Sequence, residues 1–337
     1  MDVAQGKRAQ GEEAQAEETQ AEEVLHGGNT SVVVRVGDTV RRRTGHWAPA
    51  VHALLAHLKS VGFSDAPTVV GIDDQGREVL PFVTGEVGTF DPGRLPDWFR
   101  TFEACMAIGD WLRRFHDAQR GFKPDPALPW RMYAGRALRD GEVLVHHDAA
   151  PYNTIRRPDG GLTVIDWDFC APGDPVEDLA FSAWQWIPLW ADKGAVAEGH
   201  GGAMTVLEAA TKLAALADGY DASADQRSRL IDVCVHQMTK HADDVEAMAV
   251  TDLTFARLVD LGIPRNARLD AEWVSDHEAV LSAAVRGVVE RPTDDAGRGA
   301  ADRQCDRPLD QRQVGQGEDA RCVRRARCHH RGGRGVT

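Results

Sequence analysis

Residues 146–153 read His-His-Asp-Ala-Ala-Pro-Tyr-Asn, and residues 162–166 read Leu-Thr-Val-Ile-Asp. The first stretch has the spacing His-x-Asp-x-x-x-x-Asn. The second is a short β-prone run that ends in an acid. The apolar run at residues 142–145 can form a strand that delivers His146, and Pro-Asp-Gly-Gly at residues 158–161 signals a turn between the two stretches. The sequence therefore predicts a loop followed by a hairpin whose two ends lie close together.

These side chains are the ones that phosphoryl transfer from ATP requires. A carboxylate must orient the acceptor hydroxyl and take its proton, and Asp148 is placed to do so. Asn153 and Asp166 offer amide and carboxylate oxygens, which are the hard ligands that Mg²⁺ prefers. The protein-kinase signature has the same spacing and a later metal-binding Asp. We therefore predict Asp148 as the catalytic base, Asn153 and Asp166 as metal ligands, and Mg²⁺ and ATP as cofactors.

With these residues, the segment 143–189 resembles the catalytic core of the aminoglycoside phosphotransferase and choline kinase-like family, a branch of the protein-kinase fold. Residues 172–180, Pro-Gly-Asp-Pro-Val-Glu-Asp-Leu-Ala, match the family's downstream Asp-Leu-Ala element. The N-terminal part resembles a bacterial subgroup with trifolitoxin-immunity-like members, so the resemblance covers about residues 25–285. It implies an α+β, bilobal protein-kinase-like fold, with a small β-rich N-lobe and a larger, mainly helical C-lobe.

The resemblance also implies supporting roles around the catalytic loop. Asp178 would be a structural acid that braces the loop, and His146 would anchor it by hydrogen bonding. Asp168 could bind a second Mg²⁺ or hold the loop by hydrogen bonds, and we favour the second role.

The composition divides the chain into four regions. Residues 1–25 repeat Glu, Ala and Gln, which predicts a disordered acidic leader. Residues 26–84 are predicted as the nucleotide-binding N-lobe, and residues 85–285 as the C-lobe with the catalytic loop and acceptor site. Residues 286–337 are rich in Arg and Gly and poor in apolar residues, which predicts a disordered tail or an out-of-frame end.

Within the two lobes, residue patterns predict individual elements. Alternating β-branched residues indicate strands, and apolar residues at helical spacing indicate helices. Thr84-Gly85-Glu86 is predicted as the hinge between the lobes. The expected strands are residues 31–36, 39–42, 68–72 and 78–83, and the expected helices are residues 50–58, 104–116, 206–216 and 229–248.

Nucleotide contacts are predicted from the small lobe. Gly27 and Gly28 precede the first strand and could let backbone N–H groups approach phosphate oxygens, although such a pair is also typical of a simple turn. Arg42 stands where kinases place the phosphate-contacting lysine, and a solvated basic strand end is the alternative. Phe82 and Val83, just before the hinge, complete the predicted nucleotide contacts.

Two positions depart from the kinase pattern. The small-lobe helix should carry a Glu that pairs with the phosphate-contacting cation, but it offers His52. The ion pair is then missing or is rebuilt, with Glu78 or Asp73 as candidates. His147 stands beside Asp148 where relatives carry a small residue, and it is expected to pack or to face solvent rather than to tune Asp148.

Composition sets broader bounds. The 337 residues are 42% hydrophobic, enough to bury a sizeable core. The segment between the leader and the tail carries a charge of −12 out of −13, which disfavours nucleic acid and suits a cationic small substrate. No apolar run is long enough to span a membrane, the N-terminus lacks the basic-then-apolar order of a signal peptide, and the six cysteines show no disulfide spacing. The cytoplasm is the expected compartment.

The main functional hypothesis is an ATP- and Mg²⁺-dependent phosphotransferase that moves the γ-phosphate to a hydroxyl of a small molecule. The alternative on the same fold is a non-catalytic nucleotide-binding or immunity protein. A phosphohydrolase with a metal-binding His-Asp pair is a third hypothesis, for which His116-Asp117 is the upstream candidate. The acceptor stays open among aminoglycoside, macrolide, choline-like amine, sugar and peptide, and nothing in the sequence indicates an oligomeric state.

Overall fold

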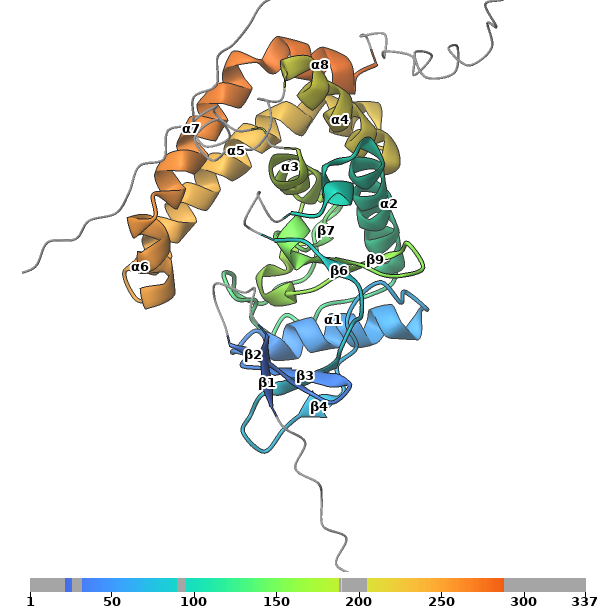
Figure 1. Ribbon diagram of the computed structural model, residues 1–337, viewed down its shortest axis with the longest axis vertical. Coiled ribbons are helices and arrows are strands. Elements are labelled where there is room, and N and C mark those ends of the chain that lie inside the picture. The colour runs from blue at the N-terminus through green and yellow to red at the C-terminus, as the bar shows by residue number, and fades with distance from the viewer. Residues whose placement is uncertain (1–21, 26–31, 90–94, 188, 190–204, 288–337) are drawn as a thin grey trace, which may run out of the picture. The chain divides into compact units, whose positions relative to one another are not determined.

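The computed structural model describes residues 22–25, 32–89, 95–187, 189 and 205–287 (Figure 1). The chain begins with a five-stranded antiparallel sheet in the order β1-β2-β3-β5-β4. Its strands are β1 (Glu23–Leu25), β2 (Val33–Val36), β3 (Thr39–Arg42), β4 (Gly71–Ile72) and β5 (Glu78–Pro81). Helix α1 (Ala48–Ser60) lies between this sheet and the catalytic hairpin in Figure 1.

Strand register in the small sheet places Arg42 opposite Glu78. A tight turn at Gly37, which has a φ of 59°, connects β2 to β3 so that Val36 pairs with Thr39. Strand β5 then pairs with β3, and this register sets Arg42 directly across from Glu78. Directly opposed residues on one face of a sheet have Cβ atoms only about 4.5–5.5 Å apart, so their side chains can bond.

The predicted catalytic segment forms two small sheets. Strand β7 (Val143–Val145) pairs with β10 (Ala171–Gly173). Strands β8 (Thr154–Arg156) and β9 (Leu162–Val164) form the hairpin, and β6 (Glu86–Val87) adds to its edge. The 3₁₀ turns η3 (Pro151–Asn153) and η4 (Trp167–Phe169) lie at the two ends of this hairpin. The β8–β9 hairpin therefore holds the segments at residues 146–153 and 162–166 next to each other.

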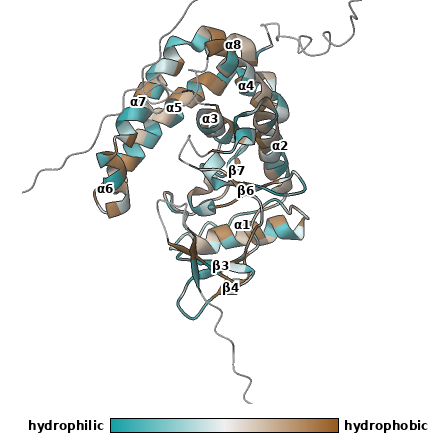
Figure 2. Ribbon diagram, in the orientation of Figure 1, coloured by the Kyte–Doolittle hydropathy of each residue, from teal (hydrophilic) through white to brown (hydrophobic). Residues whose placement is uncertain are grey.

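The remaining regular elements of the described chain are helices. Helix α5 packs against α3, α6, α7 and α8, and α2 packs against α4. Both hydrophilic and hydrophobic residues are found on the outer helices α5 and α7 (Figure 2), as expected for helices with one buried face. The elements are η2 (Asp97–Arg100), α2 (Phe102–Ala118), α3 (Pro175–Trp186), α4 (Val206–Gly219), α5 (Ala224–Ala249), α6 (Leu253–Asp260), α7 (Ile263–Asp276) and α8 (Glu278–Val285).

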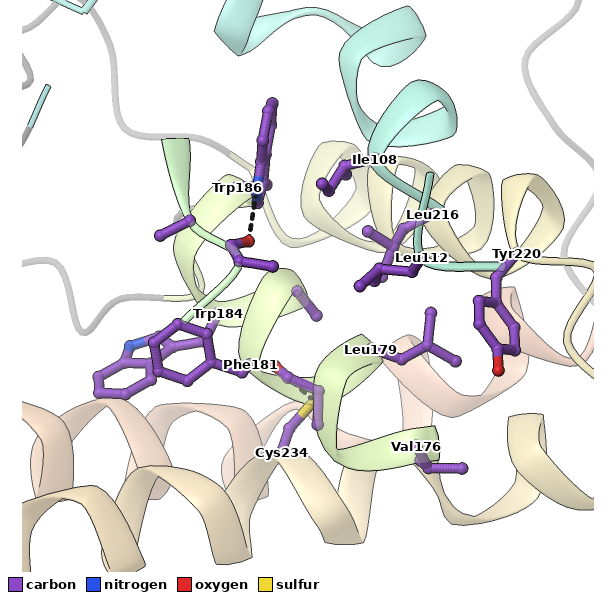
Figure 3. Packing of buried hydrophobic residues seen from close by; sticks show 14 of the residues in the cluster. Ile108, Leu112, Val176, Leu179, Phe181, Trp184, Trp186, Leu216, Tyr220 and Cys234 are labelled. Carbon is purple, nitrogen blue, oxygen red and sulfur yellow. Dashed lines mark hydrogen bonds between the residues drawn. The ribbon is translucent and has the colours of Figure 1, made fainter. Parts of the chain in front are cut away.

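One hydrophobic core runs from α1 through α2 to the helices of the large lobe. Figure 3 shows Leu179 of α3 and Leu112 of α2 within it, together with Leu216 of α4. The indole N–H of Trp186 in α3 donates to the carbonyl oxygen of Ala149 at 2.9 Å. The core thus ties the catalytic loop to α3. No helix in the described ranges is long and apolar enough to cross a membrane.

The fold class predicted from the sequence is confirmed: an antiparallel β-sheet is followed by a mainly helical region. The predicted helices and strands are present, with ends that shift by a few residues. Helix α5 begins five residues early, because Ser223 and Gln226 form a capping box at its start.

The predicted disordered leader needs a correction. Residues Glu23–Leu25 form β1 and pair with β2, so the small sheet begins inside the segment 1–25. The apolar pair Val24-Leu25, at the end of the acidic repeat, supplies a strand that can pair. The remaining leader residues 1–21, and the tail from residue 288 onward, lie outside the described residues. The two-lobe boundary at residues 84 and 85 stays a prediction.

Two glycines permit close contact between α2 and α4. A Cβ atom on Gly109 would lie 2.3 Å from the carbonyl oxygen of Leu216. A Cβ atom on Gly219 would lie 2.2 Å from the carbonyl oxygen of Met106. Backbone atoms fill the space in both cases, so a side chain could enter only if the helices moved apart.

We predict that Gly109→Ala lowers the free energy of unfolding by about 1–3 kcal/mol, because it overpacks this helix contact. Urea denaturation would measure the loss. Gly71→Ala is the matched control, since a Cβ atom there meets nothing within 4 Å, and its effect should stay within about 0.5 kcal/mol. An equal loss in both variants would contradict the packing argument.

Candidate functional site

The catalytic loop is held by Asp178 from the first turn of α3. Its carboxylate accepts the backbone N–H groups of His146 and His147, each at 2.8 Å, and it contacts His116 Nε2 at 3.0 Å. Asp178 is fully buried. Burial alone would raise its pKa, but the hydrogen bond from His116 holds the pKa below the ordinary value. The structure therefore places Asp178 where a brace of the loop would have to lie.

His146 lies behind the loop as a buried, neutral ring. Its Nδ1 accepts the backbone N–H of Asp148 at 3.3 Å. The ring makes an edge-on contact with Trp167, with 4.8 Å between ring centroids. Burial lowers the pKa of His146 to about 4, so the imidazole is neutral near pH 7 and can act as a hydrogen-bond acceptor. These contacts are those of an anchor.

His147 is fixed by two hydrogen bonds and has left-handed backbone geometry. Its φ is 61°, and its Nε2 lies 2.9 Å from Glu177 Oε2. Its Nδ1 lies 3.1 Å from the carbonyl oxygen of Phe169. His147 therefore connects the loop to α3 and η4 by side-chain hydrogen bonds, whereas the sequence predicted that it would only pack or face solvent.

Asp148 has hydrogen-bonded partners on both carboxylate oxygens. Tyr152 donates its phenol O–H to Oδ1 at 2.8 Å, and Asn153 donates Nδ2 to Oδ2 at 2.8 Å. Burial raises the pKa of Asp148 to about 8, and the negative charge of Asp166 adds to this effect. The two hydrogen bonds oppose the rise. The carboxyl group is therefore a stronger base than an ordinary Asp.

Asn153 and Asp166 lie on either side of the hairpin junction. Asn153 donates its amide N–H groups to Asp148, at both the carbonyl oxygen and Oδ2, so its amide oxygen is the atom that the predicted metal ligation would use. The carbonyl oxygen of Asn153 accepts the N–H of Ile165 at 2.8 Å, so the residue before Asp166 is tied to Asn153. Asp166 itself has a left-handed backbone, with φ 62° and ψ 69°.

The structure joins Arg42 of the small sheet to the catalytic hairpin. Its Nη1 lies 2.7 Å from Asp166 Oδ1, its Nη2 lies 2.7 Å from Asp168 Oδ1, and its Nε bonds Glu78. The guanidinium is almost fully buried. Burial alone would lower the pKa of Arg42, but the three carboxylates raise it. Arg42 is therefore a paired, buried cation, and the solvated basic run was the wrong alternative.

The ion pair that the small-lobe helix lacks is rebuilt on the sheet. Glu78 is 2% exposed and bonds Arg42 with one oxygen. Its other oxygen lies 2.8 Å from His52 Nε2 of α1. Asp73, the other candidate, instead pairs with Arg77 at 2.8 Å. His52 thus supports the acid that fixes the cation.

A second arginine completes the charged cluster. Arg131, from the segment between α2 and β7, lies 3.4 Å from Asp168 Oδ2. Its guanidinium stacks on the rings of Trp47 at 4.6 Å and Phe169 at 4.5 Å. Asp168 therefore bonds two arginines, Arg42 and Arg131, and its role in holding the loop stays a prediction. We define the ionic cluster as Arg42, Arg131, Glu78, Asp166 and Asp168.

Sequence reasoning missed Arg131 and Tyr152 as members of the site. Arg131 lies in a segment with no helical or strand period, so no local pattern indicated where its side chain lies. Tyr152 lies inside the His-x-Asp-x-x-x-x-Asn motif. Its position four residues after Asp148 was the signal that could have identified it as a member of the site.

The predicted nucleotide contacts are placed only in part. Gly27 and Gly28 lie outside the described residues. The ring of Phe82 carries the guanidinium of Arg35 at 3.9 Å from its centroid, and its backbone N–H donates to Asp38. Val83 is partly exposed next to it. Nucleotide contact by Phe82, Val83 and Arg42 stays a prediction.

The His-Asp phosphohydrolase hypothesis finds no support in the described part of the chain. There, no group of three or more His, Cys, Asp or Glu side chains is arranged to hold a metal ion. His116 contacts the Tyr220 hydroxyl and Asp178 instead. A Mg²⁺ site can use fewer protein ligands, because this ion keeps several waters and substrate oxygens.

Comparison with known proteins identifies the family. The model of the phosphotransferase enzyme family matches residues 134–216, which include the catalytic loop. The trifolitoxin immunity protein of Rhizobium leguminosarum bv. trifolii is 35% identical over 268 residues, covering 77% of this chain and 97% of that protein. This chain therefore belongs to the phosphotransferase family.

Solved structures share the fold at low sequence identity. A choline/ethanolamine kinase family protein from Mesorhizobium loti is 17% identical, with a TM-score of 0.51, covering 81% of this chain and 94% of that chain. An amicoumacin kinase in complex with AMP-PNP, Ca²⁺ and Ami is 14% identical, with a TM-score of 0.53, covering 77% and 89%. These likenesses confirm the kinase-like fold that the sequence predicted.

We predict that Glu78→Gln lowers the free energy of unfolding on the order of 3 kcal/mol, because it removes a buried charge that Arg42 and His52 share. Urea denaturation would measure it. Glu86→Gln is the matched control. Glu86 is half-exposed and lies 3.7 Å from Arg156, so its loss should change stability by no more than about 1 kcal/mol. A small effect of Glu78→Gln would show that the other carboxylates of the ionic cluster suffice to stabilise the buried charge of Arg42.

The raised pKa of Asp148 predicts a pH-dependent stability difference. The folded pKa is about 8, and the unfolded pKa is about 3.9. Between these values the folded chain keeps a proton that the unfolded chain releases, so the wild type loses stability as the pH rises. Asp148→Asn cannot lose that proton. Its stability relative to the wild type should therefore increase between about pH 4 and pH 8.

Chemical denaturation at several pH values would measure this difference. The other titrating groups contribute equally, to first order, to the pH dependence of stability in both proteins, so their contributions cancel in the difference. Asp74→Asn, at an exposed turn position, is the matched control for replacing an aspartate by asparagine. A difference that shrinks as the pH rises would show that the pKa of Asp148 is not raised.

Proposed function

We propose that this chain is an ATP-dependent phosphotransferase that moves the γ-phosphate of ATP to a hydroxyl group of a small molecule. The observation that carries this proposal is the convergence of Asp148, Asn153 and Asp166. Asn153 bonds Asp148 directly, and the charge of Asp166 acts on Asp148. Phosphoryl transfer needs a base and metal ligands at one point.

The donor atoms at this point fit Mg²⁺. The negative charge of Asp166 disfavours the ionised form of Asp148, and a divalent cation would offset that charge. The amide oxygen of Asn153 and the carboxylate of Asp166 are hard oxygen ligands. When bound, Mg²⁺ would neutralise charge on the ATP phosphates. Asn153 and Asp166 would hold it.

The remaining roles follow from the contacts. Asp148 would orient the acceptor hydroxyl and accept its proton while the new bond to phosphorus forms and the bond to ADP breaks. Arg42 has a planar fork that suits phosphate oxygens, and it already lies against Asp166. Asp178, His146 and Asp168 would hold the loop and the hairpin in place.

The acceptor that we propose is a small molecule, and a cationic one would be favoured by the acidic body of the chain. The charge of −12 between residues 26 and 290 attracts cations at long range. A role in resistance or immunity agrees with the name of the 35% identical relative. That name also supports a second candidate, in which the chain binds nucleotide and confers immunity without catalysis.

We predict that Asp148→Asn lowers the turnover of ATP with an acceptor by about 10²–10⁴-fold, the range that general base catalysis contributes. Nucleotide binding should stay largely intact, because Asp148 is not a predicted nucleotide contact. The measurements are ATP consumption across an acceptor library and thermal shift with nucleotide, each with and without Mg²⁺. Asp74→Asn is the matched control and should behave as the wild type.

The same experiment separates the two candidate functions. A wild-type protein that is stabilised by nucleotide and Mg²⁺, yet consumes no ATP with any acceptor, would support the non-catalytic role. Equal turnover in the wild type and in Asp148→Asn would reject Asp148 as the base.

A further inference from the structure

The phenol of Tyr152 is hydrogen-bonded to Asp148, the general base of the proposed site. Its hydroxyl donates to Asp148 Oδ1 at 2.8 Å, while Asn153 bonds Oδ2 at the same distance. A substrate hydroxyl engages a general base at about 2.6–3.2 Å. Tyr152 therefore makes the hydrogen bond that an acceptor hydroxyl would have to make.

The backbone around Tyr152 is tightly held. Tyr152 lies in the single 3₁₀ turn η3, in which the N–H of Asn153 donates to Ala150 at 3.0 Å. Gly88 passes so close to this turn that a Cβ atom on it would lie 1.9 Å from the carbonyl oxygen of Pro151. Rotation of the partly exposed side chain is thus the simplest way for the phenol to leave Asp148.

We propose that Tyr152 is a positioning and specificity residue, whose hydroxyl holds the acceptor position on Asp148 until an acceptor hydroxyl displaces it. This inference rests on the proposed phosphotransferase function. In the absence of an acceptor, the phenol keeps water from the base and so suppresses the wasteful hydrolysis of ATP. An acceptor must replace one good hydrogen bond to enter, which selects against weakly bound hydroxyl compounds.

The first experiment uses water as the acceptor. Phosphate release from Mg²⁺-ATP by the full chain, with no acceptor added, is compared between the wild type and Tyr152→Phe. The variant keeps the ring and loses only the hydroxyl, so water can reach Oδ1. We expect the maximal rate of hydrolysis to rise about threefold to tenfold, which matches the loss of one net hydrogen bond. The KM for ATP should not change.

The chain offers a matched control for this change. It has three tyrosines, and Tyr133 is an exposed one whose ring lies beside Lys240 at 5.6 Å. Tyr133→Phe removes a phenol hydroxyl without touching Asp148, and its hydrolysis rate should stay within twofold of the wild type. A rise in both variants would point to a general loosening and would overturn the assignment.

A second measurement tests the hydrogen bond without nucleotide. With ¹³C at the Cζ atoms of tyrosine, NMR resolves three side-chain signals, and Tyr152→Phe identifies one of them. We expect Asp148→Ala, which removes the acceptor oxygens, to move the Tyr152 signal and to leave the Tyr133 signal in place, because of these two tyrosines it is Tyr152 that bonds the carboxylate. An unmoved Tyr152 signal would show that the hydrogen bond is not formed and would overturn the proposal.

The outcomes separate this inference from the proposed function. A measurable wild-type rate that Tyr152→Phe does not raise would overturn the role of Tyr152 alone. A phosphate group found on Tyr152 after incubation with Mg²⁺-ATP would make the phenol an acceptor and would also overturn it. No consumption of ATP by any variant, with or without acceptors, would overturn both the inference and the phosphotransferase function.

Discussion

The buried guanidinium of Arg42 is the interaction on which the site depends. It links Glu78 of the small sheet to Asp166 and Asp168 of the catalytic hairpin. Removing charges from water is expensive, and only good geometry with several hydrogen bonds offsets the cost. Here each bonding nitrogen of the guanidinium faces a different carboxylate. The contact between the sheet and the hairpin therefore depends on the same groups that we assign to metal and phosphate.

This arrangement changes how Arg42, the predicted phosphate-contacting cation, is fixed. In protein kinases a lysine on a strand pairs with a glutamate on a helix, and the position of that helix controls activity. Here both partners lie on paired strands, and the register of β3 with β5 sets Arg42 opposite Glu78. Helix α1 supports this ion pair through His52, whose Nε2 bonds Oε2 of Glu78. The cation is thus fixed by a sheet register, so its placement does not require helix movement.

The choice of arginine follows from the same geometry. A lysine ammonium is a compact point charge, whereas the guanidinium fork presents donors in fixed directions. Arg42 uses these directions to reach acids from two parts of the chain at once. A lysine in its place could not hold Glu78, Asp166 and Asp168 in the same defined arrangement.

The sequence predicted the local parts of the site and left the tertiary parts open. The loop and hairpin could be placed because short-range spacing and a turn determine where Asp148 lies relative to Asn153. Glu78 remained one of two candidates, because strand register depends on a hairpin whose exact pairing no single residue indicates. Arg131 left no signal, since its position is set by stacking on Trp47 and Phe169, which are far from it in the sequence.

Two residues of the site, His147 and Asp166, have strained backbone conformations that neighbouring side chains hold in place. His147 and Asp166 have φ values of 61° and 62°, in the left-handed region that residues with a Cβ atom rarely adopt. Such residues cost on the order of 1–3 kcal/mol each and persist only where their surroundings hold them. Asp178 bonds the N–H of His147, and Arg42 bonds the carboxylate of Asp166. Each strained residue thus has its own restraint. The site is therefore shaped by the folded chain itself, as a reaction that depends on positioning requires.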